Sequence, residues 1–417
     1  MKEITTRCCI VGGGPAGMML GFLLSRAGID VIVLEKHGDF LRDFRGDTVH
    51  PSTLELMYEV GLLEDFLRRP HQQLERMAIQ IGEQMVWVGD FRHLPTHAKF
   101  IAFMPQWDFL NFLAERGQVY PEFHLRMKTE AVDLIEENGV VSGVRAETPE
   151  GDLVVRCGLV VGTDGRHSVV REKAGLKVED NGAPMDVLWM RVPREPSDPG
   201  QSLGRVLRGR MLVMLNRGEY WQCAFVIPKG TAEEVKGRGI ESFRAELARL
   251  VPYFRGRVSE LKNWDDVKLL TVKVDRLAEW HKPGLICIGD AAHAMSPIGG
   301  VGINLAVQDA VAAANVLAPP LASTSVAGHA LTPYLQRIQK RREFPTRVTQ
   351  RIQILAQDRV IRRVLAGSQP ITVPFILKLM QSLPILQRIP ARAIGLGVRP
   401  EHVKTQDVHR LTKSARS

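Results

Sequence analysis

Cysteine is scarce in this sequence, and the few cysteines form no recognisable disulfide or metal pattern. There are five in 417 residues, an odd number, and no C-x-x-C pair or other metal-ligand spacing occurs. Three of the positions lie in apolar runs that are typical of buried strands. We therefore expect free, buried thiols in a reducing cytosol, with no redox-active cysteine and no bound metal.

Long apolar segments and a secretory leader are also missing. No stretch approaches the roughly 20 apolar residues that span a bilayer. After MKEITTR the chain enters the short apolar run 8–11 directly, without the longer hydrophobic core of a signal peptide. The composition, 45% hydrophobic and 24% charged, is that of a soluble globular protein, and 417 residues suit two closely joined domains. A cytoplasmic protein is expected.

Acidic residues are scarce only toward the C-terminus. Residues 333–417 hold 17 Lys and Arg against four Asp and Glu, so this region carries a net charge of +13, the preceding residues −4 and the whole chain +9. No nucleic-acid recognition module accompanies the charge, and we expect no nucleic-acid binding.

Three segments share one pattern, a short apolar strand followed by a glycine-rich turn and a helix. They read RCCIV-GGGPAG from Arg7, CGLVVG-TDGRHSVVREKAG from Cys157 and GLICIGDAAHAMSPIGG from Gly284. Apolar strands that alternate with helices indicate a parallel sheet covered by helices on both faces. The expected fold class is α/β, with a Rossmann-like dinucleotide domain.

Between the second and third of these segments the pattern changes to that of antiparallel strands. Three segments read as strands, at 185–192, 210–216 and 219–227. Asn216-Arg217-Gly218 is the expected hairpin turn between the last two. Residues 231–250 read as one helix, opened by a Thr231/Glu234 capping box.

The chain therefore divides into a discontinuous dinucleotide domain, an inserted α+β sheet domain and a basic helical C-terminal region. We assign 1–75, 101–178 and 267–332 to the first, 76–100 and 179–266 to the second, and 333–417 to the third. In the third, 333–363 is expected to form one or two Arg-rich helices. The apolar stretch 371–397 carries Lys378, Arg388 and Arg392 but no acid, and prolines break it into short pieces. It either packs back onto the dinucleotide domain or makes a peripheral membrane contact that delivers a lipophilic substrate.

The first glycine turn, Gly12-x-Gly14-x-x-Gly17, is typical of dinucleotide binding. Gly12 permits the tight turn, Gly14 lets the backbone approach a pyrophosphate, and Gly17 allows the helix to pack closely on the strand. Pro15 suits the first helical position, and the helix N-terminus offers free N–H groups to phosphates. Glu35 ends the next strand, where it either accepts hydrogen bonds from a ribose or is simply solvated. These features fit NAD as well as FAD.

A family resemblance chooses between the two cofactors. GGGPAG, the motif Asp164-Gly165-Arg166-His167-Ser168-Val169-Val170-Arg171 and the motif Gly289-Asp290-Ala291-Ala292-His293 occur in the order seen in class A flavoprotein monooxygenases, the relatives of p-hydroxybenzoate hydroxylase. The resemblance covers about residues 5–320. It implies that NADH or NADPH reduces FAD, that O2 then forms a flavin C4a-hydroperoxide, and that this hydroxylates or epoxidises an aromatic or lipophilic substrate. Only one dinucleotide fingerprint is present, which agrees with a transiently bound NAD(P)H.

The resemblance also implies roles for individual residues. Asp290 would hydrogen-bond the ribityl chain of FAD, and Asp164 and Gly165 would contact FAD and the passing nicotinamide. Arg171 would hold either its own loop or a phosphate. The helix N-terminus at 301–304, which follows a bare glycine turn, would stabilise negative charge on the reduced flavin ring. The predicted FAD-binding residues are Gly12, Gly14, Pro15, Ala16, Gly17, Glu35, Lys36, Arg45, Gln106, Val132, Asp164, Gly165, Asp290, Pro297, Gly300, Val301, Gly302, Ile303 and Asn304.

Fewer signals point to catalytic and substrate-binding residues. Arg45 resembles a family arginine near the flavin, Pro297 precedes the glycine turn at the ring, and His50 titrates near neutrality, so these three are the catalytic candidates. His293 is either an acid–base residue or a packing residue. Substrate contacts, or ordinary core packing, are predicted on strands of the sheet domain whose register is open, at Trp189, Arg191, Met211, Met214, Trp221, Gln222 and Phe225.

Three other functions share this fold. Flavin halogenases carry W-x-W-x-I-P, whereas here Cys223 and Phe225 occupy the tryptophan positions before Ile227-Pro228. An FAD-dependent reductase of lipid double bonds, like geranylgeranyl reductase, is a second alternative. A non-catalytic carrier of prenylated proteins is a third, against which the intact motifs argue. The expected partners are a small-molecule substrate and O2, and the expected assembly is a monomer or homodimer.

Overall fold

The fold is built around an eight-stranded sheet with a parallel centre. The computed structural model describes residues 2–41, 48–200, 202–323, 326–367 and 372–410. Strands β20, β11, β1, β2 and β8 are parallel neighbours in that order, and β19 pairs antiparallel at the edge. Their bounds are β1 Lys2–Val11, β2 Val31–Leu34, β8 Phe123–Arg126, β11 Gly151–Gly162, β19 His281–Lys282 and β20 Leu285–Cys287. The predicted α/β class with a parallel sheet is confirmed.

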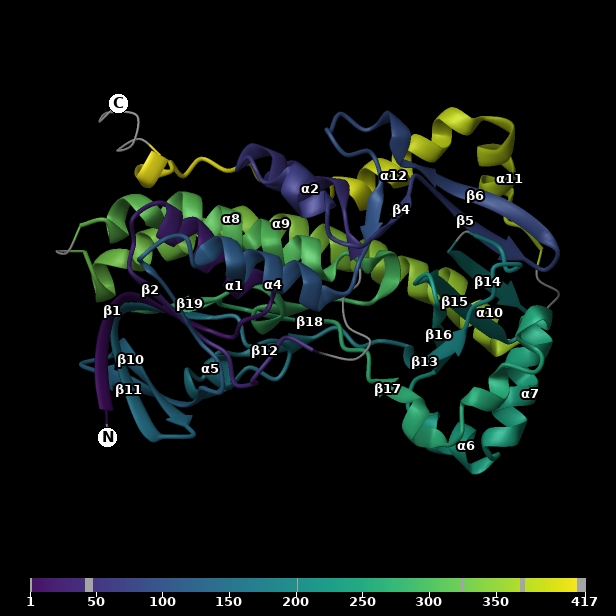
Figure 1. The fold of residues 1–417 in the computed structure, drawn as a ribbon, viewed down its shortest axis with the longest axis horizontal. Coiled ribbons are helices and arrows are strands. Elements are labelled where there is room, and N and C mark those ends of the chain that lie inside the picture. Colours follow the sequence, from purple (N-terminus) through teal and green to yellow (C-terminus); the bar gives the residue numbers. More distant parts are fainter. Residues whose placement is uncertain (1, 42–47, 201, 324–325, 368–371, 411–417) are drawn as a thin grey trace.

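Long helices lie together along one side of this sheet (Figure 1). They are α1 (Pro15–Arg26), α4 (Gln106–Gly117), α8 (Gly302–Leu321) and α9 (Thr332–Ala356). The antiparallel pair β9 (Glu130–Glu137) and β10 (Val140–Thr148) branches from β11, and the short helix α5 (Val169–Lys173) packs beside β9. The end of β1, from Cys8 to Val11, is buried because strands pair with both of its edges and α1 packs over it.

The expectation that no segment is long and apolar enough to cross a membrane is wrong for one helix. Ile298–Leu321, which is α8 with its leading turn, qualifies by length and composition. However, 78% of its most apolar window is buried inside the fold. A helix that is apolar on all sides is the pattern of a central core helix.

The described cysteines are all free thiols. Cys8, Cys9, Cys223 and Cys287 are buried, as predicted, and Cys157 is partly buried. Burial raises the pKa of the Cys8, Cys223 and Cys287 thiols, which disfavours the reactive thiolate.

A second, seven-stranded sheet brings together strands from two separate parts of the sequence. Its order is β17-β13-β16-β15-β14-β5-β6, antiparallel except between β14 and β5. The bounds are β5 Arg76–Ile81, β6 Gln84–Asp90, β13 Met185–Pro193, β14 Leu203–Leu207, β15 Arg210–Asn216, β16 Tyr220–Pro228 and β17 Lys268–Leu270. The predicted hairpin turn is confirmed, since the Gly218 N–H donates to the Asn216 side chain at 2.8 Å.

The single helix predicted over 231–250 is wrong. The chain forms α6 (Ala232–Gly237) and α7 (Ile240–Leu250), separated by Gly239 at φ 83°. That left-handed conformation suits glycine and ends a right-handed helix. The capping box is also absent, because the Thr231 hydroxyl donates backward to the Pro228 carbonyl at 2.9 Å.

The C-terminal helices divide between the two sheets. α9 packs on α8. In contrast, α10 (Arg362–Ala366), α11 (Phe375–Ser382) and α12 (Arg388–Gly395) pack against the second sheet, with α11 and α12 lying over β5 and β6 in Figure 1. Leu377 and Val364 join the apolar cluster of Val206, and Ala391 joins that of Phe91. The predicted packing of the stretch 371–397 onto the dinucleotide domain is therefore corrected for α11 and α12, whose apolar side chains are buried mainly against the second sheet and the segment that follows β6.

Candidate functional site

The glycine turn after β1 is packed directly against the turn after β11. A Cβ at Gly12 would lie 2.6 Å from the Thr163 carbonyl oxygen, and a Cβ at Gly17 would overlap the Gly12 carbonyl. The Thr163 hydroxyl lies 2.8 Å from the carbonyl oxygen of Val11 and 2.7 Å from that of Gly12. Parallel pairing of β1 with β11 brings the two motifs together at the carboxyl ends of both strands.

Three other glycines face open space instead of protein. A Cβ at Gly14 would meet only the Thr163 carbonyl oxygen, at 3.9 Å, and one at Gly165 or Gly302 would meet nothing within 4 Å. Among the described residues no side chain caps the N-terminus of α1 or α8, so their first N–H groups are available to a ligand. We call the open backbone at these two helix N-termini the cradle, and it suits the phosphates of a dinucleotide such as FAD.

Glu35 braces the first glycine turn. Its carboxylate is buried and accepts the Gly13 N–H and the His37 N–H, each at 3.0 Å, on different oxygens. Both carboxylate oxygens therefore fix backbone N–H groups at the end of β2, where a ribose contact was predicted.

The remaining predicted cofactor residues come from several separate elements. Ala16 is buried beside Gly289, Gln106 begins α4, and Val132 lies on β9 three residues after Thr129, whose N–H donates to the Glu35 carbonyl. Lys36 is largely exposed and pairs with Glu130 at 3.6 Å. Arg45, a catalytic and cofactor candidate, lies outside the described residues.

An ion pair joins the second and third motifs. Asp290 follows β20, and its carboxylate lies 3.5 Å from the Arg166 guanidinium. Asp164 accepts the Ser168 hydroxyl at 2.5 Å and the Val170 N–H at 3.1 Å. Burial raises the pKa of the Asp164 carboxyl, which these hydrogen bonds oppose. The structure thus places two carboxyl groups and one guanidinium at the carboxyl ends of β11 and β20.

Arg171 holds the loop rather than an open site. Its guanidinium donates to the carbonyl oxygens of Arg166 and of Ala291, the latter at 3.4 Å, and lies 3.8 Å from Asp275. Of the two predicted roles, these contacts favour the structural one.

Asp309, which was not among the predicted site residues, lies at 0% exposure inside α8. Its carboxylate accepts the Gly289 N–H at 3.0 Å, lies 2.6 Å from His293 Nε2 and accepts the Arg342 Nε–H at 2.8 Å. An acid within the apolar run VQDAVAAA was the available signal. His293 is therefore a buried partner of this carboxylate, which favours its packing role over acid–base chemistry.

The loop 296–300 at the start of α8 is held from two sides. From one side the Thr48 hydroxyl donates to the Gly300 carbonyl at 2.8 Å. From the other, the Gln353 amide of α9 donates to the carbonyls of Ser296 and Ile298, both at 2.9 Å, and accepts the Ser296 N–H at 3.2 Å. Thr48 and Gln353 were also missed; helical spacing of Gln350, Gln353 and Gln357 was the only signal for the second.

The Asn304 side chain is engaged by other parts of the protein. Its Oδ1 accepts the His50 N–H at 2.9 Å and the Thr53 hydroxyl at 2.7 Å. Only the backbone N–H of this residue, with those of Gly302 and Ile303, belongs to the helix N-terminus predicted to face the flavin. Sequence pattern could not reveal this, because the partners are about 250 residues away.

His50 is fully buried at the start of α2 (Pro51–Glu59). Its Nδ1 lies 2.8 Å from the Ile394 carbonyl oxygen. Because a carbonyl only accepts, Nδ1 carries the proton, and Nε2 is a buried acceptor without a hydrogen-bond partner in the described part of the chain. Burial lowers the pKa of His50 to about 4, so the ring is neutral at physiological pH.

Strand register separates the predicted substrate residues into two groups. Trp189, Arg191, Met211 and Gln222 share one face of the second sheet, and Met214, Trp221 and Phe225 share the other. Met211 lies in an apolar cluster with Ile298 of the loop 296–300, which we call the flavin loop. Its face of the sheet is therefore the one toward this loop.

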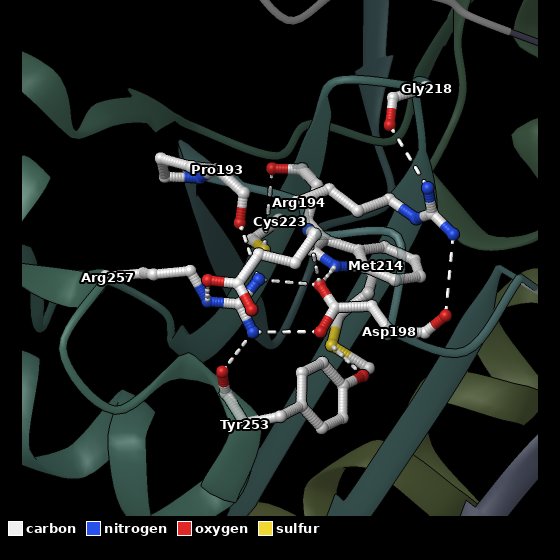
Figure 2. A network of polar contacts seen from close by, with 10 residues as sticks. Pro193, Arg194, Asp198, Met214, Gly218, Cys223, Tyr253 and Arg257 are labelled. Atoms are coloured by element: carbon white, nitrogen blue, oxygen red, sulfur yellow. Dashed lines mark hydrogen bonds and ion pairs between the residues drawn. The ribbon is translucent and has the colours of Figure 1, made fainter.

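The prediction that Met214, Trp221 and Phe225 contact substrate is therefore corrected. They pack in the core between the sheet and α7, and the Phe225 ring meets Phe243 edge-on at 5.4 Å. The Trp221 indole N–H donates to Asp198 at 2.9 Å. Figure 2 shows Asp198 facing the Arg257 guanidinium, which donates to both carboxylate oxygens at 2.6 and 2.8 Å and lowers the pKa of Asp198 to about 2.

The fold and its glycine cradle define a dinucleotide-binding flavoprotein, and comparison with known proteins identifies the family. Residues 5–351 match the family model described as FAD binding domain. The 6-methylpretetramide 4-monooxygenase of Streptomyces rimosus is 31% identical over 391 residues, 92% of each chain. The chain therefore belongs to this FAD-binding family and is an FAD-dependent monooxygenase, which confirms the class A resemblance and FAD as cofactor.

Solved structures show the same fold at lower identity. The p-nitrophenol 4-monooxygenase of Pseudomonas putida DLL-E4 has a TM-score of 0.72 at 21% identity and covers 95% of this chain and 98% of its own. A flavin-dependent brominase has a TM-score of 0.76 at 16% identity, with coverages of 99% and 100%.

Alanine substitutions at Gly14 and Gly17 are expected to separate a cofactor contact from a packing contact. Gly17→Ala forces a Cβ into the Gly12 carbonyl, so the apoprotein should lose about 1–3 kcal/mol of stability. Gly14→Ala meets no close protein atom, so the apoprotein should keep its melting temperature while FAD affinity falls at least about tenfold, or 1.4 kcal/mol. Thermal unfolding and FAD fluorescence titration measure the two effects. Equal destabilisation of both apoproteins would contradict this division.

Gln353→Leu is expected to loosen the flavin loop. Leucine cannot bond the three backbone groups that Gln353 satisfies, and each buried unsatisfied group costs about 1–3 kcal/mol. The melting temperature should fall and the dissociation constant for FAD should rise. Gln336→Leu, at an exposed position of the same helix, is the matched control. If the two variants behave alike, the loop does not depend on Gln353.

Acid is expected to destabilise the fold through His50. In the unfolded chain this residue titrates near 6.5, so protons bind the unfolded state first as the pH falls. Between pH ~6.5 and ~4 the free energy of unfolding therefore falls by about 1.4 kcal/mol per pH unit, whereas above pH ~6.5 His50 has no effect on it. Urea unfolding of the wild type and His50→Gln at pH 7 and pH 5 measures it. The wild type should lose more stability than the variant, and parallel losses would refute the assignment.

Proposed function

We propose that the enzyme hydroxylates an aromatic substrate, using NADH or NADPH and O2. The observation that carries the proposal is a chain of contacts from the flavin loop to the predicted substrate face. When bound, FAD would take two electrons from NAD(P)H and pass one oxygen atom of O2 to the substrate, with the other leaving as water. The residues of this chain bind, orient and shield the reactants.

The contact chain starts at Thr48, which holds Gly300. Thr48 pairs across two strands with Phe103 of β7 (Ile101–Phe103). The Arg217 guanidinium lies over the Phe103 ring, 5.9 Å from its centre, and the Arg217 Nε–H donates to Gln222 at 2.9 Å. The flavin loop is thus connected to the second sheet through the Phe103 ring, the Arg217 guanidinium and the buried Gln222 amide.

These groups suit a ring that carries oxygen substituents. A guanidinium favours the ionised form of a nearby phenol, and the resulting electron-rich ring accepts an electrophilic oxygen more readily. Gln222, with Trp189 and Arg191 on the same face, is therefore the proposed substrate-orienting group. The monooxygenase that is 31% identical is named for oxidation of 6-methylpretetramide, which supports a polycyclic aromatic substrate class.

A surface cavity beside Asp164 and Gly165 is the proposed contact region for the nicotinamide cofactor. It measures about 520 Å³ and is lined by His167, Ser168, Arg171 and neighbouring residues. Its position next to the second motif supports this assignment, although Glu172 also lines the cavity and Arg171 is held by its own loop. The predicted assembly, monomer or homodimer, and the cytoplasmic location stay predictions.

Halogenation is the second candidate, because the brominase shares the fold. Cys223 and Phe225 replace the two tryptophans of the halogenase motif, and Cys223 and Phe225 lie in the core against α7. This favours oxygen transfer.

A substrate screen tests the proposed function. Purified FAD-loaded protein is incubated with NADH or NADPH, phenolic polycyclic compounds and ¹⁸O2, and peroxide release is measured in parallel. We expect one ¹⁸O atom in the product per NAD(P)H consumed. A product that forms equally without O2 would indicate the lipid double-bond reductase instead, and a brominated product in the presence of bromide would indicate a halogenase.

A further inference from the structure

An apolar surface covers the outer side of the last helices. Its five side chains are between 50% and 80% exposed: Phe375, Ile376, Leu383, Ile385 and Ile389. They lie within one short stretch of α11, α12 and the 3-10 turn between them, which we call the C-terminal apolar surface. Single exposed apolar side chains are ordinary, whereas clustered ones are typical of surfaces that bind a partner or a membrane.

The helices that present this surface are fixed to the fold. The Gln381 side chain donates to the Trp87 carbonyl at 2.7 Å and accepts the Trp87 N–H at 3.2 Å, which adds α11 to the edge of β6. Gln387 donates to the Met380 carbonyl at 3.0 Å. Since the backbone is already ordered, a partner would not have to fold the segment on binding.

The charge of this segment is entirely positive. Residues 372–400 contain four Lys and Arg and no Asp or Glu, and Lys378, Arg388 and Arg392 are exposed among the apolar side chains. On β6 beneath, the acid Asp90 is paired with Arg92 at 2.8 Å. A second copy seated symmetrically on this surface would bring like charges together, whereas an anionic lipid bilayer complements them.

We propose that the C-terminal apolar surface docks the protein on a bilayer that contains anionic lipids. The five apolar side chains enter the boundary between headgroups and acyl chains, and the three basic side chains meet lipid phosphates. The inner side of the same element reaches the candidate site, where the Ile394 carbonyl of α12 contacts His50. Docking therefore places lipid on the outer side of the element that contacts His50. The proposed docking does not depend on which reaction the enzyme performs.

Vesicle co-sedimentation of the full FAD-loaded chain tests the proposal. Vesicles are phosphatidylcholine alone or mixed with phosphatidylglycerol, at low and high salt. We expect binding to the mixed vesicles that weakens with salt. The Ile385→Glu/Ile389→Glu double variant should lower the binding constant at least about tenfold, since each isoleucine loses its apolar burial. Arg388→Glu/Arg392→Glu should abolish the preference for phosphatidylglycerol.

Val119→Glu is the matched control, because Val119 is 71% exposed on the loop between α4 and β8. It should bind vesicles like the wild type, and flavin absorbance with the melting temperature verifies that every variant is folded. Absence of vesicle binding at low salt, or equal binding by the isoleucine variant, overturns the proposal. A wild-type dimer that the isoleucine variant dissociates, without any vesicle binding, overturns it in favour of a second copy.

Discussion

The flavin site depends on the hydrogen bonds and ion pairs of one buried carboxylate, that of Asp309. It binds the third motif through Gly289 and His293, and it binds α9 through Arg342, which also reaches Glu401 at 3.4 Å. Burial alone would raise the pKa of this carboxyl, but the pairs with His293 and Arg342 lower it, so it stays charged at neutral pH. Removing one partner of such a buried pair costs about 3–5 kcal/mol. α9 is therefore as much a part of the flavin site as the motif itself.

This arrangement explains which parts of the fold could be predicted from the sequence. The glycine turns, their strands and the Asn216–Gly218 hairpin follow from neighbouring residues, because local backbone requirements dictate glycine and apolar character there. The other candidate cofactor residues were assigned by the family resemblance, and their roles stay predictions. Contacts such as Asn304 with His50 or Gln353 with Ser296 join residues that are 57 to 254 positions apart, and no local pattern records them.

The faces of the second sheet could not be predicted for a different reason. Alternation identifies the inner face only when the outer face is polar. Here β13 and β16 are buried on both sides, by α7 on one and by the flavin loop and α10 on the other. Trp221 and Gln222 are both nearly inaccessible although they point in opposite directions. Because the C-terminal helices complete this second layer, they are structural parts of the sheet domain and not an appended tail.

The glycines of the motifs also have two different roles, which only the structure distinguishes. At Gly12 and Gly17 the space of a side chain is filled by the chain's own backbone, so these residues are required for folding. At Gly14, Gly165 and Gly302 that space is empty, although the three positions come from three separate motifs. Gly14 caps α1 and Gly302 begins α8, and no described side chain caps either helix, so a side chain at these positions would stand between a ligand and the helix N-terminus. The cofactor site therefore consists of open backbone at helix N-termini, on a frame that Asp309 fixes through Gly289, His293 and Arg342.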